Sequence, residues 1–263
     1  VTAMMSTFMI FQGINMAAIA GAMLIVKIID AFDDVIFGYL VDRIHITEWK
    51  ALKKVTGEGK YLPWYRLTFF LFPIFTALFF CMPRGWGAGG KLAWFFVFYL
   101  LYDLSYTLVE VPMQSMIVTL TDNTDERNSI LQTKTIINSI ATIGAGMIWT
   151  VAISEHVGIG IREVALVSSV AFFFMMLPLG RGVKEHNTTL ANVDPKETEK
   201  YSLKDMWTCI KTNKYLMLLL LSTVITSCLQ TGGAVGLLVS YYHFGSSLVM
   251  AIPILISLLP VIL

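Results

Sequence analysis

Long apolar segments dominate this chain and restrict the folds that it can adopt. A helix that crosses a membrane needs about 20 predominantly apolar residues, and in lipid only helices and closed barrels satisfy their own backbone polar groups. The chain is 56% hydrophobic and 14% charged, whereas a soluble domain carries about 25% charged residues. These features predict an all-α polytopic membrane protein with eight helical segments at residues 1–12, 15–40, 63–82, 92–120, 130–153, 163–180, 215–242 and 247–263.

Both ends of the chain fall inside apolar runs. The sequence opens on Val1, its first apolar run has about 12 residues, and its last run continues to Leu263. A complete spanning helix is longer than the first run. We therefore expect a fragment of a longer protein, with helix one truncated. No basic residue precedes the first run, so we expect no cleavable signal peptide.

Basic residues alternate between the two sides of the predicted helices. Loops on one side hold 14 lysines and arginines, and loops on the other side hold three. The positive-inside rule places the richer side in the cytoplasm. On that side a polar linker at 181–214 separates an amino-terminal six-helix bundle at 1–180 from the start of a second bundle at 215–263. This plan is typical of secondary transporters. Linker residues 202–211 fit either an amphipathic surface helix or a solvated segment.

The composition argues against several other classes of protein. A net charge of +1 does not supply the clustered basic face of a nucleic-acid-binding protein. Three scattered cysteines indicate neither a disulfide framework nor a metal knuckle. No nucleophile is patterned with a base, and the four histidines fall in loops or at helix ends. We therefore expect no enzyme activity, no cofactor and no nucleic-acid partner.

Ionisable residues interrupt the second apolar segment. At membrane depth such residues are costly, and by default they mark a path for an ion or a substrate. Lys27, Asp30 and Asp34 are separated by three and four residues, so a helix places them on one face. Asp33 lies about 60° from Asp30, at the edge of that face. A solvated position for Asp33 at the cytoplasmic interface is an open alternative.

Two further segments each carry one polar face. Positions in the fourth segment repeat at intervals of four, three and four residues, and two positions in the fifth are four apart. The residues concerned are Asp103, Thr107, Glu110, Gln114, Lys134 and Asn138. A shared interior would let the interior lysines offset part of the acidic charge. The alternatives are that Asp103 faces an external vestibule and that Lys134 snorkels to the interface.

The chemistry of these faces suits a cation and a sugar. Two carboxylates one turn apart, joined by a hydroxyl from a facing helix, offer the oxygen ligands of Na⁺, and a desolvated carboxylate pair can hold a proton instead. Sugar hydroxyls are recognised by carboxylates, amides and cationic donors. One pocket could therefore bind both solutes, and mutual stabilisation of two ligands is the thermodynamic content of symport.

Four motifs carry a family resemblance. They are residues 29–38 (IDAFDDVIFG), 59–64 (GKYLPW), 106–112 (YTLVEVP) and 119–127 (TLTDNTDER). Together they resemble the helix-two, helix-three and helix-four motifs and the following cytoplasmic loop of the glycoside-pentoside-hexuronide:cation symporters. That family belongs to the major facilitator type, so the resemblance implies its amino-terminal six-helix half, with helix one truncated, plus the first helices of the second half.

The resemblance also implies roles for single residues. It implies that Asp30, Asp34 and Thr107 bind the cation, and that these residues form a metal site if the cation is Na⁺. Glu110 and Lys134 would help to bind the sugar, beside Lys27 as an interior basic group. With the neighbouring amides of the polar faces, the predicted substrate-binding set is Glu110, Lys134, Lys27, Gln114 and Asn138.

The sequence departs from the family pattern within this site. Glu110 stands where an aspartate is usual, and Lys27 and Lys134 stand where related symporters have arginines. Lysine lacks the planar two-pronged contact of arginine, so we expect a substrate other than a galactoside. The resemblance also implies a sugar-binding aspartate in family helix one that would precede Val1.

The predicted function is symport of a sugar or glycoside with Na⁺ or H⁺ by alternating access. We expect a monomeric, multi-pass protein of a bacterial cell membrane, with membrane lipid as its other partner. One alternative is a major facilitator carrier of another organic solute, such as a drug, a peptide or a lysolipid. A second is a non-transporting sensor or assembly subunit. The identities of the sugar and the ion, and the roles of Asp33 and Asp103, are left open.

Overall fold

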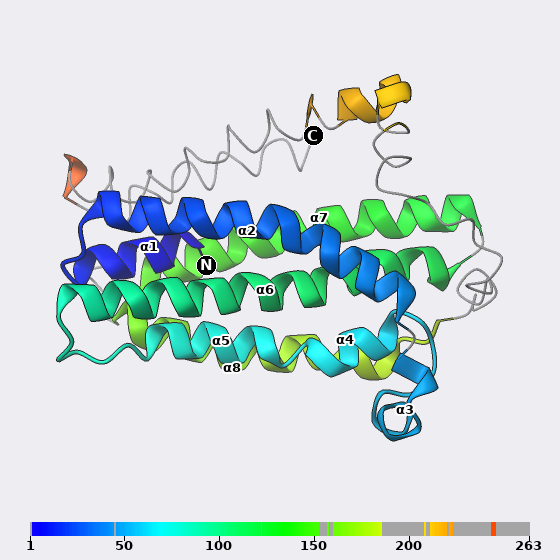
Figure 1. The fold of residues 1–263 in the computed structure, drawn as a ribbon, viewed down its shortest axis with the longest axis horizontal. Coiled ribbons are helices and arrows are strands. Elements are labelled where there is room, and N and C mark those ends of the chain that lie inside the picture. Colours follow the sequence, from blue (N-terminus) through cyan, green and yellow to red (C-terminus); the bar gives the residue numbers. More distant parts are fainter. Residues whose placement is uncertain are drawn as a thin grey trace.

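The computed structural model is a bundle of long helices that lie side by side (Figure 1). It describes residues 2–44, 46–121, 123–152, 157, 160–185, 208, 211–219, 221–222 and 243–245. The elements are α1 (Thr2–Phe11), α2 (Met16–Arg43), η1 (Ile46–Glu48), α3 (Lys50–Thr56), α4 (Leu62–Thr68), α5 (Leu71–Phe80), α6 (Ala88–Leu120), α7 (Thr124–Ala152) and α8 (Ile161–Gly182). No strand occurs among the described residues, and the predicted all-α fold is confirmed.

Several predicted segments agree with the helices to within a few residues. Segments 1–12, 15–40 and 163–180 correspond to α1, α2 and α8. Helix α7 begins at residue 124 rather than 130, because the side chain of Asn123 accepts the N–H of Asp125 at 2.9 Å and caps the helix start. The loop after the second segment contains η1 and α3, which the sequence did not predict. The linker helix at 202–211, segments 215–242 and 247–263, and the domain division lie largely outside the described residues and stay predictions.

The predicted segment at 63–82 agrees with one membrane-length stretch, Leu62–Phe80, which a turn at residues 69–70 divides into α4 and α5. Pro73 lies in the first turn of α5. A proline has no N–H to donate to the carbonyl four residues earlier, and its ring clashes with that carbonyl. That carbonyl belongs to Phe69, so the break falls where the proline requires it.

A second proline leaves its helix intact. Pro112 lies inside α6 and deprives the Leu108 carbonyl of its usual helical donor. The hydroxyl of Thr68, at the end of α4, lies 3.1 Å from this carbonyl oxygen and 2.9 Å from that of Trp64. The free carbonyl therefore has a partner from a neighbouring helix, which ties α4 to the middle of α6.

Helix α6 lies at the centre of the bundle, where it packs against α2, α4, α5 and α7. Aromatic rings fill its contact with α5. The ring centroids of Phe79 and Phe95 are 5.7 Å apart, and those of Phe72 and Tyr102 are 5.2 Å apart. These four side chains are buried. This packing on one face of α6 leaves another face for α2.

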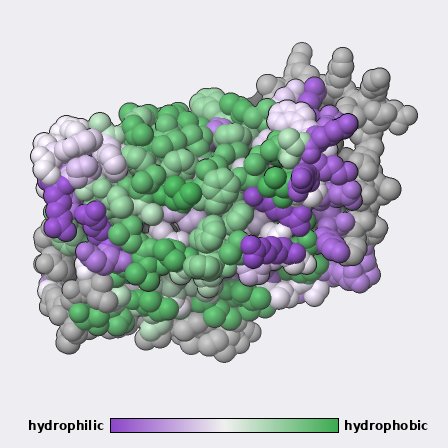
Figure 2. Space-filling view, turned by 90° about the horizontal axis from the view of Figure 1, so that it is seen from below, coloured by the Kyte–Doolittle hydropathy of each residue, from purple (hydrophilic) through white to green (hydrophobic). Residues whose placement is uncertain are grey.

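The outside of the bundle is suited to lipid. Figure 2 shows a broad apolar band between two polar ends. Four stretches of the described chain are long and apolar enough to cross a membrane: Leu62–Phe80, Ala88–Leu120, Thr124–Ala152 and Ile161–Gly182. Helix α2 has 28 residues and is also long enough, but charged residues interrupt its apolar run. A multi-pass membrane protein follows from these spans.

The carboxylate of Glu185 ties together the end of the bundle that carries α3. It accepts the backbone N–H groups of Lys60 at 2.9 Å, Tyr61 at 2.9 Å and Leu62 at 2.5 Å, at the start of α4. The first N–H groups of a helix lack partners within it, and a helix start favours a negative charge. Gly59 has a φ of +118°, and a Cβ there would lie 3.0 Å from the carboxylate carbon. Glycine is therefore required beside Glu185.

Further contacts join α4 to the ends of α2, α3 and α8. Arg66 donates to the carbonyl oxygens of Gly180 at 2.5 Å and Thr56 at 2.6 Å. Lys60 forms an ion pair with Asp42 at 3.3 Å. The GKYLPW motif, which contributed to the family resemblance, thus lies within a structural tie between helix ends.

We expect Glu185→Gln to lower the free energy of unfolding by about 1–3 kcal/mol. The neutral amide oxygen accepts more weakly than a carboxylate, and its NH₂ group opposes the backbone donors. Thermal unfolding of the purified protein in detergent measures the change. As a matched control, Glu58→Gln should shift stability by less than about 0.5 kcal/mol, since Glu58 is 83% exposed and pairs with Lys53 at 3.1 Å. Equal stability of the two variants would contradict this prediction.

Candidate functional site

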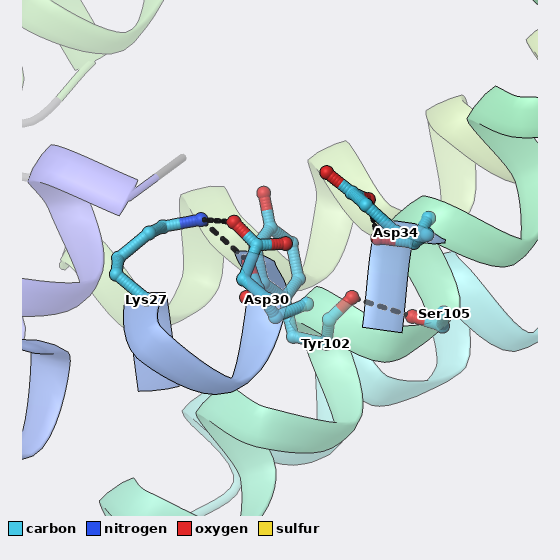
Figure 3. Close-up of polar contacts among 7 residues, drawn as sticks. Lys27, Asp30, Asp34, Tyr102 and Ser105 are labelled. Atoms are coloured by element: carbon cyan, nitrogen blue, oxygen red, sulfur yellow. Dashed lines mark hydrogen bonds and ion pairs between the residues drawn. The ribbon is translucent and has the colours of Figure 1, made fainter. Parts of the chain in front are cut away.

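The predicted cation residues meet where α2 packs against α6. The hydroxyl of Thr107 on α6 donates to Oδ1 of Asp34 on α2 at 3.1 Å. Thr107 itself is 2% exposed. Figure 3 shows Asp30 and Asp34 on successive turns of α2, with Lys27 beside Asp30. The structure therefore brings the two predicted carboxylates and the predicted hydroxyl into one site.

A third carboxylate completes what we call the aspartate cluster, Asp30, Asp33 and Asp34. One carboxylate oxygen from each residue lies within 4.8 Å of the others. Asp33 is only 7% exposed, and neither of its carboxylate oxygens has a hydrogen-bond partner among the described residues. The alternative of a solvated Asp33 is therefore wrong. Asp33, at the edge of the polar face of α2, is therefore buried, on a helix that packs against α6.

Lys27 links the aspartate cluster to α6. Its Nζ lies 2.7 Å from Oδ2 of Asp30 and 3.0 Å from Oδ1 of Asp103. The Asp103 side chain is 6% exposed, so its placement in an external vestibule is wrong. Spacing within one helix could not reveal this pair, because it depends on the register of α2 against α6. The sequence did contain one indication that Asp103 lies in the interior, because Asp103 shares its helix face with Thr107.

Three of the predicted substrate residues form a hydrogen-bonded chain. Gln114 donates from Nε2 to Oε1 of Glu110 at 3.3 Å, and its Oε1 accepts from Nζ of Lys134 at 2.5 Å. Lys134 of α7 is thus held against α6, and its snorkelling to the membrane interface stays an open alternative. Asn138 is exposed on α7 and forms no hydrogen bond with this group in the described part of the chain.

Negative charge prevails along these faces. The acids are Asp30, Asp33, Asp34, Asp103 and Glu110, and the bases are Lys27 and Lys134. A buried carboxylate without a positive partner is costly, and a cation or a proton among these oxygens would remove that cost. Carboxylate and hydroxyl oxygens are hard ligands that suit small hard cations rather than soft metals. The donor set therefore fits Na⁺ or H⁺.

A bundle of long apolar helices with an acidic cluster between two of them defines a polytopic membrane protein of the transporter class. The chain belongs to the family described as MFS/sugar transport protein, whose model matches residues 6–260. This membership confirms the resemblance to the major facilitator symporters. It also identifies the family as one of transporters rather than enzymes.

Individual relatives are sugar carriers or symporters by name. The isoprimeverose transporter of Lactiplantibacillus pentosus is 28% identical over 220 residues, which cover 78% of this chain and 43% of the relative. An uncharacterized symporter of Bacillus subtilis (strain 168) is 25% identical over 246 residues, covering 91% and 50%. The glucuronide carrier protein homolog of Escherichia coli (strain K12) is 30% identical over 115 residues, covering 44% and 23%. This chain spans half or less of the length of these relatives. No solved structure matches it.

We expect Asp33→Asn to raise the free energy of unfolding by about 1–2 kcal/mol. The substitution removes a buried charge without a hydrogen-bond partner and relieves its repulsion by Asp30 and Asp34. Thermal unfolding in detergent without added Na⁺ measures the gain. The matched control is Asp125→Asn, an exposed aspartate in the first turn of α7, which should cost a few tenths of a kcal/mol. A loss of stability in Asp33→Asn would contradict the prediction.

Proposed function

We propose that this protein is part of a secondary active transporter that moves a sugar or glycoside together with Na⁺ or H⁺. The observation that carries the proposal is the aspartate cluster, in which Asp33 is buried, Asp30 is half-buried and Asp34 is exposed but bonded to the buried Thr107 of α6. Alternating access would arise from movement of the amino-terminal bundle against a second bundle. Such a movement needs no covalent chemistry from the side chains.

The cation half of the site rests on charge and on ligand type. Three clustered carboxylates repel one another, and a bound cation or proton reduces that repulsion. The Thr107 hydroxyl fixes the Asp34 carboxylate at 3.1 Å and offers its own oxygen as a further ligand. We propose that Asp30, Asp34 and Thr107 bind the coupling ion and that Asp33 lies within the same ligand set.

The sugar half of the site rests on the chain from Glu110 through Gln114 to Lys134. A carboxylate, an amide and an ammonium in sequence offer both acceptors and donors, as hydroxyl groups of a sugar require. Glu110 lies three residues from Thr107 and hence about one helical turn away. A sugar on this chain would thus lie beside the cation, and each ligand could stabilise the other.

An uptake panel tests the proposal. Membrane vesicles containing the full-length protein would be given isoprimeverose, a glucuronide, a lysolipid and a dipeptide, each with and without gradients of Na⁺ or H⁺. We expect accumulation of a sugar or glycoside that one of the two gradients stimulates. Accumulation of the lysolipid or the dipeptide alone, or no uptake of any solute by folded protein, would contradict the proposal.

We expect Asp34→Asn to abolish cation stimulation of sugar uptake, because the amide removes a negative charge and reverses part of the hydrogen bonding with Thr107. The measurement is initial uptake rate as a function of Na⁺ concentration at fixed pH, and of pH at fixed Na⁺. Asp125→Asn serves as the control and should keep the wild-type dependence. Survival of the cation dependence in Asp34→Asn would show that the coupling ion binds elsewhere.

We expect Glu110→Gln to weaken sugar binding by about tenfold or more, because hydrogen bonds to a charged acceptor are worth about 1.5–3 kcal/mol. Cation binding should be kept, since Thr107 and the aspartate cluster are unchanged. Equilibrium binding of the transported sugar to purified protein gives the first quantity, and sodium binding gives the second. Glu163→Gln, at the first turn of α8, is the matched control. Equal loss of both ligands would contradict separate roles for the two halves of the site.

A further inference from the structure

The Lys27 ammonium is shared between carboxylates of two different helices. It lies 2.7 Å from Asp30, a member of the aspartate cluster, and 3.0 Å from Asp103 on α6. Asp103 lies outside the cluster and before the 106–112 motif, so neither the ligand set proposed above nor that motif includes it. The ion pair of Lys27 with Asp103 therefore joins α2 to α6 outside the proposed ligand set.

The two carboxylates differ in their burial. The Asp103 side chain is 6% exposed, whereas that of Asp30 is 23% exposed and that of Lys27 is 51% exposed. A charge pair gains more from its attraction where the surroundings exclude water. The second carboxylate oxygen of Asp103, Oδ2, is buried and has no hydrogen-bond partner among the described residues. Since an ammonium has three donors, Asp103 can take a second contact from Lys27.

We infer that Asp103 is a positioning residue that controls how strongly Lys27 competes with the coupling cation. The inference rests on the cation site proposed above. While the ammonium bonds Asp30, it neutralises one of the carboxylates that the cation uses. A cation that binds to the cluster repels the ammonium, which can then move fully onto Asp103. The move gives up one ion pair but keeps the other, so no lysine charge is left without a partner.

Removal of the Asp103 charge would change this balance. Lys27 would have Asp30 as its one carboxylate partner among the described residues, and the cation would have to displace it without a second carboxylate to receive it. We expect Asp103→Asn to weaken cation binding by about tenfold, equivalent to about 1.4 kcal/mol. Asp103→Glu keeps the charge, so we expect it to restore binding to within about threefold of wild type.

The decisive variant is the double substitution Lys27→Gln with Asp103→Asn. Without the competing ammonium, Asp103 has nothing to position. In the Lys27→Gln background we therefore expect Asp103→Asn to change cation affinity by less than about twofold, against the tenfold loss with Lys27 present. A purely structural role for Asp103 predicts the same loss of affinity in both backgrounds, in step with a loss of thermal stability.

The experiment measures binding of sodium to the purified full-length protein by calorimetry, and proton binding from pH changes in unbuffered solution. Thermal unfolding of each variant reports whether it is folded. If Asp103→Asn alone does not fold, the pair Lys27→Gln and Lys27→Gln/Asp103→Asn still tests the inference, because a large difference between them overturns it. Unchanged affinity in folded Asp103→Asn overturns it as well. Wild-type protein that binds neither cation overturns the proposed function itself, and this inference with it.

Discussion

The burial of carboxylates between α2 and α6 is the constraint on which the rest of this structure depends. Each unpaired charge removed from water costs several kcal/mol, and Asp33 of α2 and Asp103 of α6 are both buried. The fold supplies Lys27 and the Thr107 hydroxyl as partners. These partners do not cover all the acidic oxygens. Part of the acidic charge here is therefore left without a positive partner, which is why we propose that a cation binds at this place.

Such a site needs a frame that holds its two helices in register. Helix α6 supplies one side of this frame, since it packs against α2, α4, α5 and α7. Its proline creates a free carbonyl at Leu108, and Thr68 reaches that carbonyl from α4. Large buried rings such as Phe79 and Phe95 fix the opposite face. Because α6 is held on its other sides, its polar face (Asp103, Thr107, Glu110 and Gln114) keeps a fixed position against α2.

Periodicity in the sequence was sufficient to predict much of this arrangement. The helical spacing of Lys27, Asp30 and Asp34 placed them together, because a helix repeats its faces within one continuous segment. The same rule located the polar face of α6 that contains Thr107. It left the surroundings of Asp33 and Asp103 open, because their burial depends on which neighbour covers the edge of each face. The partnership of Lys27 with Asp103 spans 76 residues of sequence, and periodicity within one helix carries no information on such a contact.

The contacts around Glu185, at the end of the bundle that carries α3, could not be predicted from periodicity either. The motif at 59–64 was recognisable, but its partner Glu185 lies more than 120 residues away. Glu185, beyond α8, is bonded to the start of α4, and Arg66 in the last turn of α4 is bonded to the end of α8. Lys60 bonds the same region to α2 through Asp42. These bonds hold the end of α2 nearest the aspartate cluster, as the proposed alternating access would require of a bundle that moves as one body.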